Sequence, residues 1–147
     1  MAILVPLDRT PVAEIVVPLV AAAARGAGAT VRLLLVAPVP QNQVSEDGRV
    51  VAYADQEMAR LEAEGLDYLR TVEMQFGRSG NVECVVRFGD PVDEILREAD
   101  GFGADLIAVT TAGRSALGRV VLGSVAEQVV RKADAPVMLM RAGRNGH

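Results

Sequence analysis

The sequence predicts an α/β fold in which helices cover both faces of an open, doubly wound sheet of five parallel strands. The candidate strands are unbroken apolar runs rather than alternating ones, which is typical of strands covered on both faces. Segments with helical spacing separate these runs along the 147 residues, as expected for consecutive βαβ units. A chain of this length can bury one core, so residues 1–147 are expected to form a single domain.

The strands give the clearest signals, because each is rich in apolar and β-branched residues and is bounded by Gly, Pro or Asp. In chain order the predicted strands are Ala2–Leu7, Thr30–Val36, Val82–Phe88, Asp105–Thr110 and Pro136–Met140. The single cysteine, Cys84, lies in the third strand and cannot form an internal disulfide. Packing in the core is therefore favoured for this thiol over redox chemistry.

Helical segments alternate with the strands. They are expected at about Val12–Ala27, at Val51–Phe76, from Pro91 onward and at about Val120–Lys132, while the polar segment Pro38–Arg49 is expected to be a loop. Thr10 and Asp90 each precede a proline, and this order supplies an N-cap followed by a residue suited to the first helical position. In the helix that begins at Pro91, Ile95 and Leu96 are expected to face the core.

Charge and composition argue against several functions. The net charge of −4 makes nucleic acid an unlikely main partner. The only histidine, His147, is the last residue, so we expect neither a His/Cys metal cluster nor a Ser-His-Asp triad. The apolar run Ile15–Ala24 is too short to span a bilayer, and it follows acidic residues where a signal peptide carries positive charge. We therefore expect a cytoplasmic protein without a membrane partner.

The loop after the fourth strand is the best candidate for a ligand site. Ligands bind doubly wound sheets outside the carboxyl ends of the strands. The loop Thr111–Gly118 is rich in small residues, and glycine lets main-chain N–H groups approach an anion near a helix N-terminus. Arg114 and Arg119 would add charge-assisted contacts. The alternative is that these glycines only form a turn.

The spacing of this loop resembles that of the universal stress protein family. Gly113 is followed by nine residues and then by Gly123-Ser124, and nucleotide-binding members of the family carry Gly-x2-Gly-x9-Gly-Ser/Thr at this place. The segments ILVPLDRTP at the start and DLIAVT before the loop also look like the family, so the resemblance covers nearly the whole chain. It implies a parallel sheet of strand order 3-2-1-4-5 and a homodimer that binds ATP together with Mg²⁺.

The resemblance also implies a set of contacts with the nucleotide. Pro6, Leu7 and Asp8 would lie beside the adenosine, and Val36 would pack on the adenine. The ribose and phosphates would lie against Thr110–Ala116 and Gly123–Ala126, with the following candidates: Thr110, Thr111, Ala112, Gly113, Arg114, Ser115, Gly123, Ser124 and Val125. The chemistry agrees, because a carboxylate accepts from hydroxyl or amino groups, a valine offers an apolar wall to a purine, and a serine donates to a phosphate.

Two alternatives concern single residues of this set. Asp8 could serve only as a partner of the helix N-terminus, and Val36 could belong to the core alone. The chain also departs from the family motif, because Thr110 stands at the first glycine and Ala112 stands where many members carry a polar or basic residue. A threonine can hinder close approach to the main chain.

These features predict a stress-response protein that binds ATP at the carboxyl edge of its sheet and acts as a dimeric, nucleotide-dependent switch or sensor, with an unidentified protein partner. The chain has no Walker lysine and no evident general base, so at most slow ATP hydrolysis is expected. The short apolar strand Pro136–Met140 is expected at a sheet edge, where it would pair with a second copy. The alternative is a dimeric interaction protein of the same family that binds no nucleotide.

Overall fold

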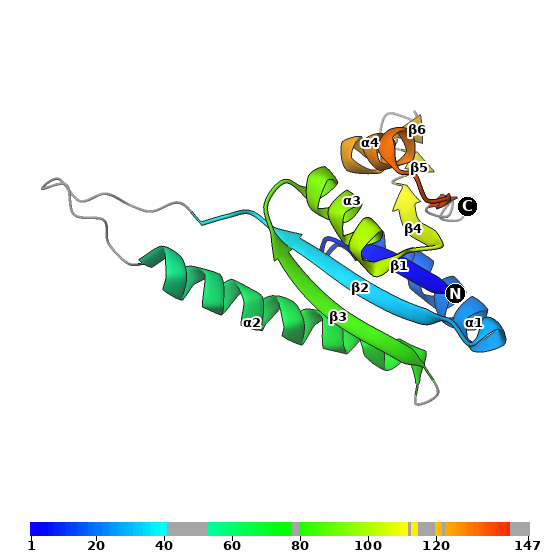
Figure 1. Cartoon of the computed structure of the whole chain (residues 1–147), viewed down its shortest axis with the longest axis horizontal. Coiled ribbons are helices and arrows are strands. Elements are labelled where there is room, and N and C mark those ends of the chain that lie inside the picture. The colour runs from blue at the N-terminus through cyan, green and yellow to red at the C-terminus, as the bar shows by residue number, and fades with distance from the viewer. Residues whose placement is uncertain (41–52, 78–79, 112, 115–119, 122, 142–147) are drawn as a thin grey trace, which may run out of the picture.

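The computed structural model describes residues 1–40, 53–77, 80–111, 113–114, 120–121 and 123–141 (Figure 1). Five parallel strands form its main sheet: β1 (Ala2–Leu7), β2 (Thr30–Ala37), β3 (Asn81–Phe88), β4 (Leu106–Thr111) and β7 (Val137–Arg141). Their order is β3-β2-β1-β4-β7, so the predicted order 3-2-1-4-5 is confirmed. Strands β2 and β3 follow β1 toward one edge of the sheet, and β4 and β7 lie on its other side. The order of the strands therefore reverses between β1 and β4.

Strand β1 is the centre of the sheet because both of its edges are paired. It pairs with β2 along its whole length, from Ala2 opposite Thr30 to Leu7 opposite Leu35. On the other side, Ile3 lies opposite Leu106 in β4. The side chains of Leu4 and Val5 are fully buried, as an unbroken apolar strand requires.

The two faces of the sheet carry separate cores. Helices α1 (Val17–Ala27) and α2 (Tyr53–Glu73) cover one face, and α3 (Pro91–Phe102) and α4 (Ser124–Lys132) cover the other (Figure 1). Side chains of β1 alternate between them, since Ile3 and Val5 join the α1/α2 core and Leu4 joins the α3/α4 core. The doubly wound arrangement is therefore confirmed. None of the described helices is long and apolar enough to cross a membrane.

The first helical segment starts as a 3₁₀ turn. This turn, η1 (Ala13–Val16), precedes α1, and the Thr10 hydroxyl accepts a hydrogen bond from the Ala13 N–H at 3.2 Å. Thr10 thus hydrogen-bonds to the start of the turn as a cap would, but the helical turn begins at Ala13 with Val12 in the N-cap position, so Pro11 does not occupy the predicted first helical position. Helix α1 ends at Gly28, whose φ of 63° is left-handed. A second 3₁₀ turn, η2 (Met74–Phe76), ends the long helical segment that starts with α2.

The structure corrects the expected start of the last helix. Helix α4 begins at Ser124 rather than at Val120, because Val120 and Val121 form a short strand, β6 (Val120–Val121). This strand pairs antiparallel with β5 (Gly113–Arg114), with Gly113 opposite Val121. Adjacent β-branched residues favour an extended backbone, and here they have a partner strand.

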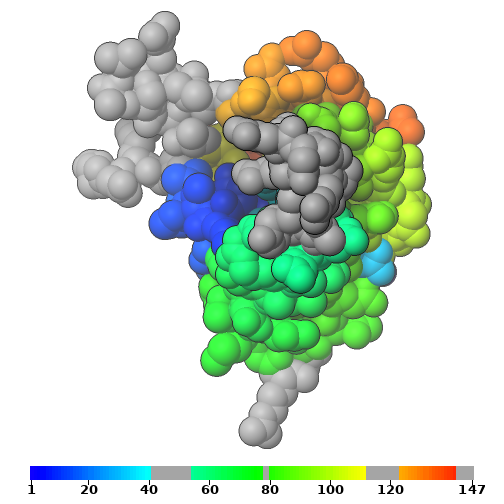
Figure 2. All heavy atoms as spheres, turned by 90° about the vertical axis from the view of Figure 1, so that its left-hand side faces the viewer, coloured from blue at the N-terminus to red at the C-terminus, as the bar shows by residue number. Residues whose placement is uncertain are grey.

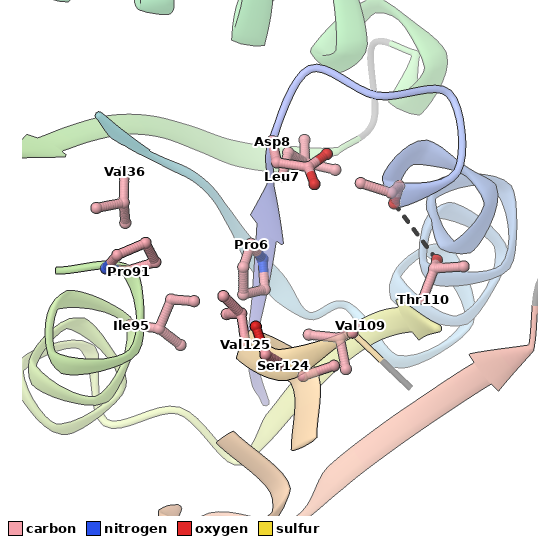
Figure 3. A pocket seen from close by; sticks show the side chains of 13 residues that line it. Pro6, Leu7, Asp8, Val36, Pro91, Ile95, Val109, Thr110, Ser124 and Val125 are labelled. Atoms are coloured by element: carbon pink, nitrogen blue, oxygen red, sulfur yellow. Dashed lines mark hydrogen bonds between the residues drawn. The ribbon is translucent and has the colours of Figure 1, made fainter. Parts of the chain in front are cut away.

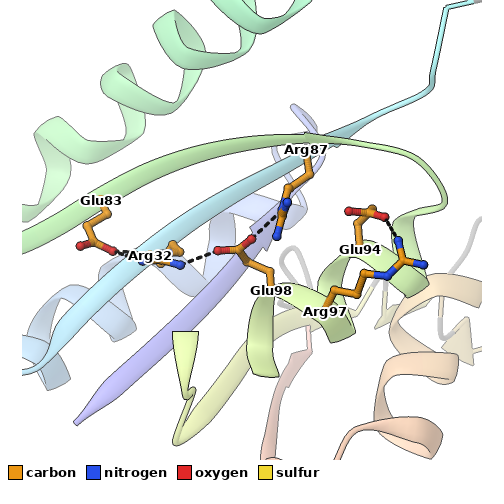
Figure 4. A network of polar contacts seen from close by, with 6 residues as sticks. All are labelled: Arg32, Glu83, Arg87, Glu94, Arg97 and Glu98. Atoms are coloured by element: carbon orange, nitrogen blue, oxygen red, sulfur yellow. Dashed lines mark hydrogen bonds and ion pairs between the residues drawn. The ribbon is translucent and has the colours of Figure 1, made fainter. Parts of the chain in front are cut away.

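Helix α3 is held to the sheet by buried charge as well as by apolar contacts (Figure 4). The Glu98 side chain is only 5% exposed and accepts hydrogen bonds from Arg32 Nη1 at 2.5 Å and Arg87 Nε at 2.7 Å. Arg32 also pairs with Glu83 at 2.7 Å. A buried carboxylate is tolerated only when it is paired in this way, so the network fixes α3 against β2 and β3.

One expectation for α3 is only half met. Ile95 is 3% exposed and lies in the α3/α4 core, but Leu96 is half-buried and belongs to neither core. Val92, Ile95 and Ala99 make the buried stripe. Leu96 lies at the side of that stripe. Residues four apart share a helix face, so Leu96 is near Val92, but neighbouring residues point in different directions, so it is turned away from Ile95.

Candidate functional site

A pocket of about 340 Å³ opens at the carboxyl edge of the sheet, next to the switch in strand order. Figure 2 views the molecule from this edge, with the blue start of the chain, the yellow-green α3 and the orange α4 around it. The residues that line the pocket come from both halves of the chain: Pro6, Leu7, Asp8, Ala13, Val36, Pro91, Ile95, Val109, Thr110, Gly123, Ser124, Val125 and Ala126. Figure 3 shows ten of them labelled around the opening.

The floor of this pocket is the open end of the α3/α4 core. Val36, Ile95 and Val109 all belong to that core or pack against it, and all line the pocket. Pro6 follows the buried Leu4 by two residues in β1 and so points to the same face of the sheet. The result is an apolar slot between the strand ends and the two helices, which suits a flat apolar ring.

Asp8 is the one ionisable side chain among the described residues that line the pocket. Its Oδ1 accepts hydrogen bonds from the Thr10 main-chain N–H at 3.0 Å and from the Thr10 hydroxyl at 2.5 Å. Arg9 between them has a left-handed φ of 69°. Asp8 therefore shapes the turn that leads into η1, and its exposed carboxylate stands at the rim of the pocket.

Two helices begin at this pocket, and their N-termini differ. In α3 the Asp90 carboxylate caps the helix by accepting from the Asp93 N–H at 3.0 Å. In α4 the N-cap is Gly123, which offers no side chain to the first amide groups. The first turn of an α-helix has four N–H groups without partners in the helix. Among the described residues, the N-terminus of α4 thus carries no side-chain cap and could accept an anion, while that of α3 is already capped by a carboxylate.

Neither backbone strain nor packing requires glycine at position 123. The residue has a φ of −55°, which any residue adopts, and an added Cβ would meet no described heavy atom within 4 Å. A glycine with free space beside its Cα allows a ligand to approach the main chain closely.

Thr110 lines the pocket with its side chain tied to η1. Its hydroxyl accepts a hydrogen bond from the Val16 N–H at 3.1 Å and donates one to the Ala13 carbonyl at 3.4 Å. In Figure 3 the dashed bond of Thr110 runs to the turn before α1 and away from Ser124.

The structure brings most of the candidate residues together. Nine of those expected from the sequence line the pocket: Pro6, Leu7, Asp8, Val36, Thr110, Gly123, Ser124, Val125 and Ala126. Thr111 is 6% exposed at the end of β4 and is not part of the lining. Gly113 and Arg114 form β5, and Ala112 and Ser115 lie outside the described residues.

Four lining residues were missed by the sequence reasoning: Ala13, Pro91, Ile95 and Val109. Strand alternation identifies Val109, since it places this residue on the same face as Ile107. Pro91 and Ile95 carry no local signal, because their place depends on how α3 packs across the sheet.

Cys84 lies in β3 and is not among the lining residues. Its thiol lies 3.3 Å from Glu73 Oε1, and burial together with that carboxylate raises the pKa of the thiol to about 12. The thiol is therefore protonated at neutral pH, in agreement with a packing role. No group of three or more metal-ligating side chains occurs within the described ranges.

Comparison with known proteins decides the family. Residues 1–141 match the profile described as the Universal stress protein family. The chain belongs to the universal stress protein family. The universal stress protein MJ0531 of Methanocaldococcus jannaschii is 35% identical over 82 residues, which make up 55% of this chain and 48% of that relative. The aligned part thus spans about half the length of this relative.

Solved structures agree with this universal stress protein over almost its whole length. MJ0577, from the same organism, superposes with a TM-score of 0.80 at 26% identity, over 97% of this chain and 96% of the other. A universal stress protein of Archaeoglobus fulgidus in complex with dAMP has a TM-score of 0.61 at 26% identity, over 95% and 96% of the two chains. The α/β fold of the family is therefore shared.

Proposed function

We propose that this universal stress protein binds an adenine nucleotide in the pocket at the carboxyl edge of its sheet. The observation that carries the proposal is the uncapped N-terminus of α4, which opens on an apolar slot. An apolar slot beside an anion site suits a purine that carries phosphate. The complex of the Archaeoglobus fulgidus relative with dAMP supports this class of ligand.

The base would occupy the apolar slot. Val36 and Ile95 would contact the faces of the purine, and Pro6 would close the slot from β1. The exposed carboxylate of Asp8 at the rim would accept a hydrogen bond from a ribose hydroxyl. Its Oδ1 already holds Thr10, which keeps the carboxylate in one orientation.

The phosphates would lie at the start of α4. The main-chain N–H groups behind Gly123 and the hydroxyl of Ser124 would donate to phosphate oxygens. Mg²⁺ is usually held by one or two carboxylates together with the phosphates of the nucleotide. If ATP binds with Mg²⁺, Asp8 is the lining residue whose carboxylate would hold the metal, and the metal would neutralise phosphate charge there.

A sensor or switch fits the pocket better than an enzyme. No histidine, lysine or arginine is found among the described residues that line it, and Asp8 is engaged with Thr10. Hydrolysis would need a group that orients or deprotonates water. The bound nucleotide would instead order the pocket for a protein partner, in a homodimer formed through β7.

The test is isothermal titration of the purified protein with AMP, with ATP and Mg²⁺, and with adenosine. We expect saturable binding of both nucleotides, and weaker binding of adenosine, which lacks phosphate. Val36→Asp places a charge in the apolar slot and should abolish binding. Val39→Asp is the matched control, because Val39 is 56% exposed and lies outside the lining. Absence of heat with every ligand, together with no nucleotide retained on purification, would overturn the proposal.

A further inference from the structure

The turn η1 forms one wall of the pocket through Ala13, and side chains from three other segments hold it. Thr10 accepts from the Ala13 N–H at 3.2 Å. On α2, the Tyr68 hydroxyl donates to the Glu14 carboxylate at 2.7 Å. Burial and this carboxylate raise the pKa of Tyr68, so the hydroxyl remains a donor. Thr110 makes the third connection, from the end of β4.

The hydrogen bonds of Thr110 join this wall to strand β4 of the main sheet. Its hydroxyl bonds to both ends of η1, to the Ala13 carbonyl at 3.4 Å and to the Val16 N–H at 3.1 Å. Val16 is completely buried. A buried main-chain N–H is stabilised by its acceptors, and the Thr110 hydroxyl supplies one from outside the turn, so loss of the hydroxyl removes a hydrogen bond from a buried group.

The direction of the side chain follows from strand alternation. In β4, Ala108 belongs to the α1/α2 core and Val109 to the α3/α4 core. Thr110 therefore points to the side of α1, away from the N-terminus of α4. The added side chain at this position of the family motif is directed at η1, and in Figure 3 its dashed hydrogen bond runs away from Ser124.

We propose that Thr110 is a positioning residue for the nucleotide pocket, whose hydroxyl fixes η1 and with it the Ala13 wall. The inference rests on the proposed binding of an adenine nucleotide. In this proposal the Thr110 hydroxyl bonds to η1 and does not contact the ligand. Loss of the hydroxyl frees the wall, and the ligand must then order it again on binding, which lowers the affinity.

The test compares AMP affinities by titration calorimetry for the wild type, Thr110→Val and Thr110→Ser. Valine keeps the shape and removes the hydroxyl, so we expect affinity to fall by roughly tenfold, because both hydrogen bonds from this hydroxyl to η1 are lost. Serine retains the hydroxyl and should stay within about twofold of the wild type. Thr30→Val is the matched control, since it removes a threonine hydroxyl, bonded to Asn81 at 3.1 Å, near the amino end of the strands.

A second measurement follows the hydrogen bond itself. Amide hydrogen exchange at Val16, measured by NMR without ligand, should be faster in Thr110→Val and unchanged in Thr110→Ser. Thr110→Ala serves for both measurements if the valine variant does not fold.

The outcomes separate this inference from the proposed function. Equal AMP affinity in the wild type and Thr110→Val would overturn the positioning role and leave nucleotide binding intact. Equal weakening in the valine and serine variants would also overturn it, because side-chain shape and not the hydroxyl would then matter. If the wild type binds no AMP, the proposed function fails and the positioning role fails with it.

Discussion

Helices α3 and α4 both begin at the same pocket, yet only α3 has its N-terminus capped by the side chain of its own N-cap residue. At α3 the Asp90 carboxylate caps the helix by accepting from the Asp93 N–H, and Asp93 and Glu94 add negative charge to the first turn. At α4 the N-cap is Gly123, which has no side chain, and no described side chain caps the amides. The N-termini of these two helices, which carry the same partial positive charge, thus differ in what they bind. One stabilises the fold, and the other is available to a ligand.

The largest effect is expected when α4 is made to resemble α3. Gly123→Asp supplies a carboxylate cap, and the free space beside Gly123 accommodates it. The carboxylate would take the amides and repel phosphate, so AMP affinity should fall at least about 30-fold, or about 2 kcal/mol, while helix stability is kept. Titration calorimetry and thermal unfolding measure the two quantities. Gly123→Ala is the control, with a methyl group but no charge, and an equal loss in both variants would contradict the electrostatic account.

A smaller effect is expected when the cap of α3 is removed. Asp90→Ala leaves the Asp93 N–H without its acceptor and should lower the free energy of unfolding by about 1 kcal/mol. AMP affinity should change by less than about twofold, because phosphate is expected at α4. Chemical denaturation and calorimetry on the same samples separate these effects. Asp93→Ala removes a carboxylate from the same turn but no cap, and it should cost less. A large fall in affinity in Asp90→Ala alone would place the phosphate at α3.

The smallest effect is expected at Ser124. Ser124→Ala removes one neutral donor at the start of α4 and leaves the main-chain amides in place. Affinity for AMP should fall by only about threefold, the contribution of an ordinary hydrogen bond, with adenosine binding unchanged. A loss as large as that of Gly123→Asp would show that the side chain, and not the helix N-terminus, holds the phosphate.

The sheet was predictable because its signals are local. Each predicted strand agrees with the structure to within one residue at both ends. Runs such as Ala2–Leu7 are apolar throughout, and Gly, Pro or Asp bound them. The short ribbon of β5 and β6 was not predicted, because two-residue strands depend on their pairing and not on a run of residues.

The residues of the candidate site that local sequence signals mark were predictable, and those placed by tertiary packing were not. Asp8, Gly123 and Ser124 stand at strand and helix ends, which the sequence marks. Ile95 reaches the pocket because α3 is held across the sheet by its apolar stripe and by the pairing of Glu98 with arginines of β2 and β3. The bond from Thr110 to Val16 joins residues 94 positions apart, and no local pattern signals it.

The ion pairs around Glu98 also make the two borders of the sheet unequal. Strand β3 forms one border, and its Glu83 and Arg87 are already committed to Arg32 and Glu98. A strand that paired with β3 would lie beside these charged side chains, and breaking their ion pairs would cost free energy. The opposite border is β7, where Leu139 is 41% exposed and the residues before Arg141 carry no charge. The two borders therefore differ in charge, and we expect that a strand added to this sheet would pair with β7 and not with β3.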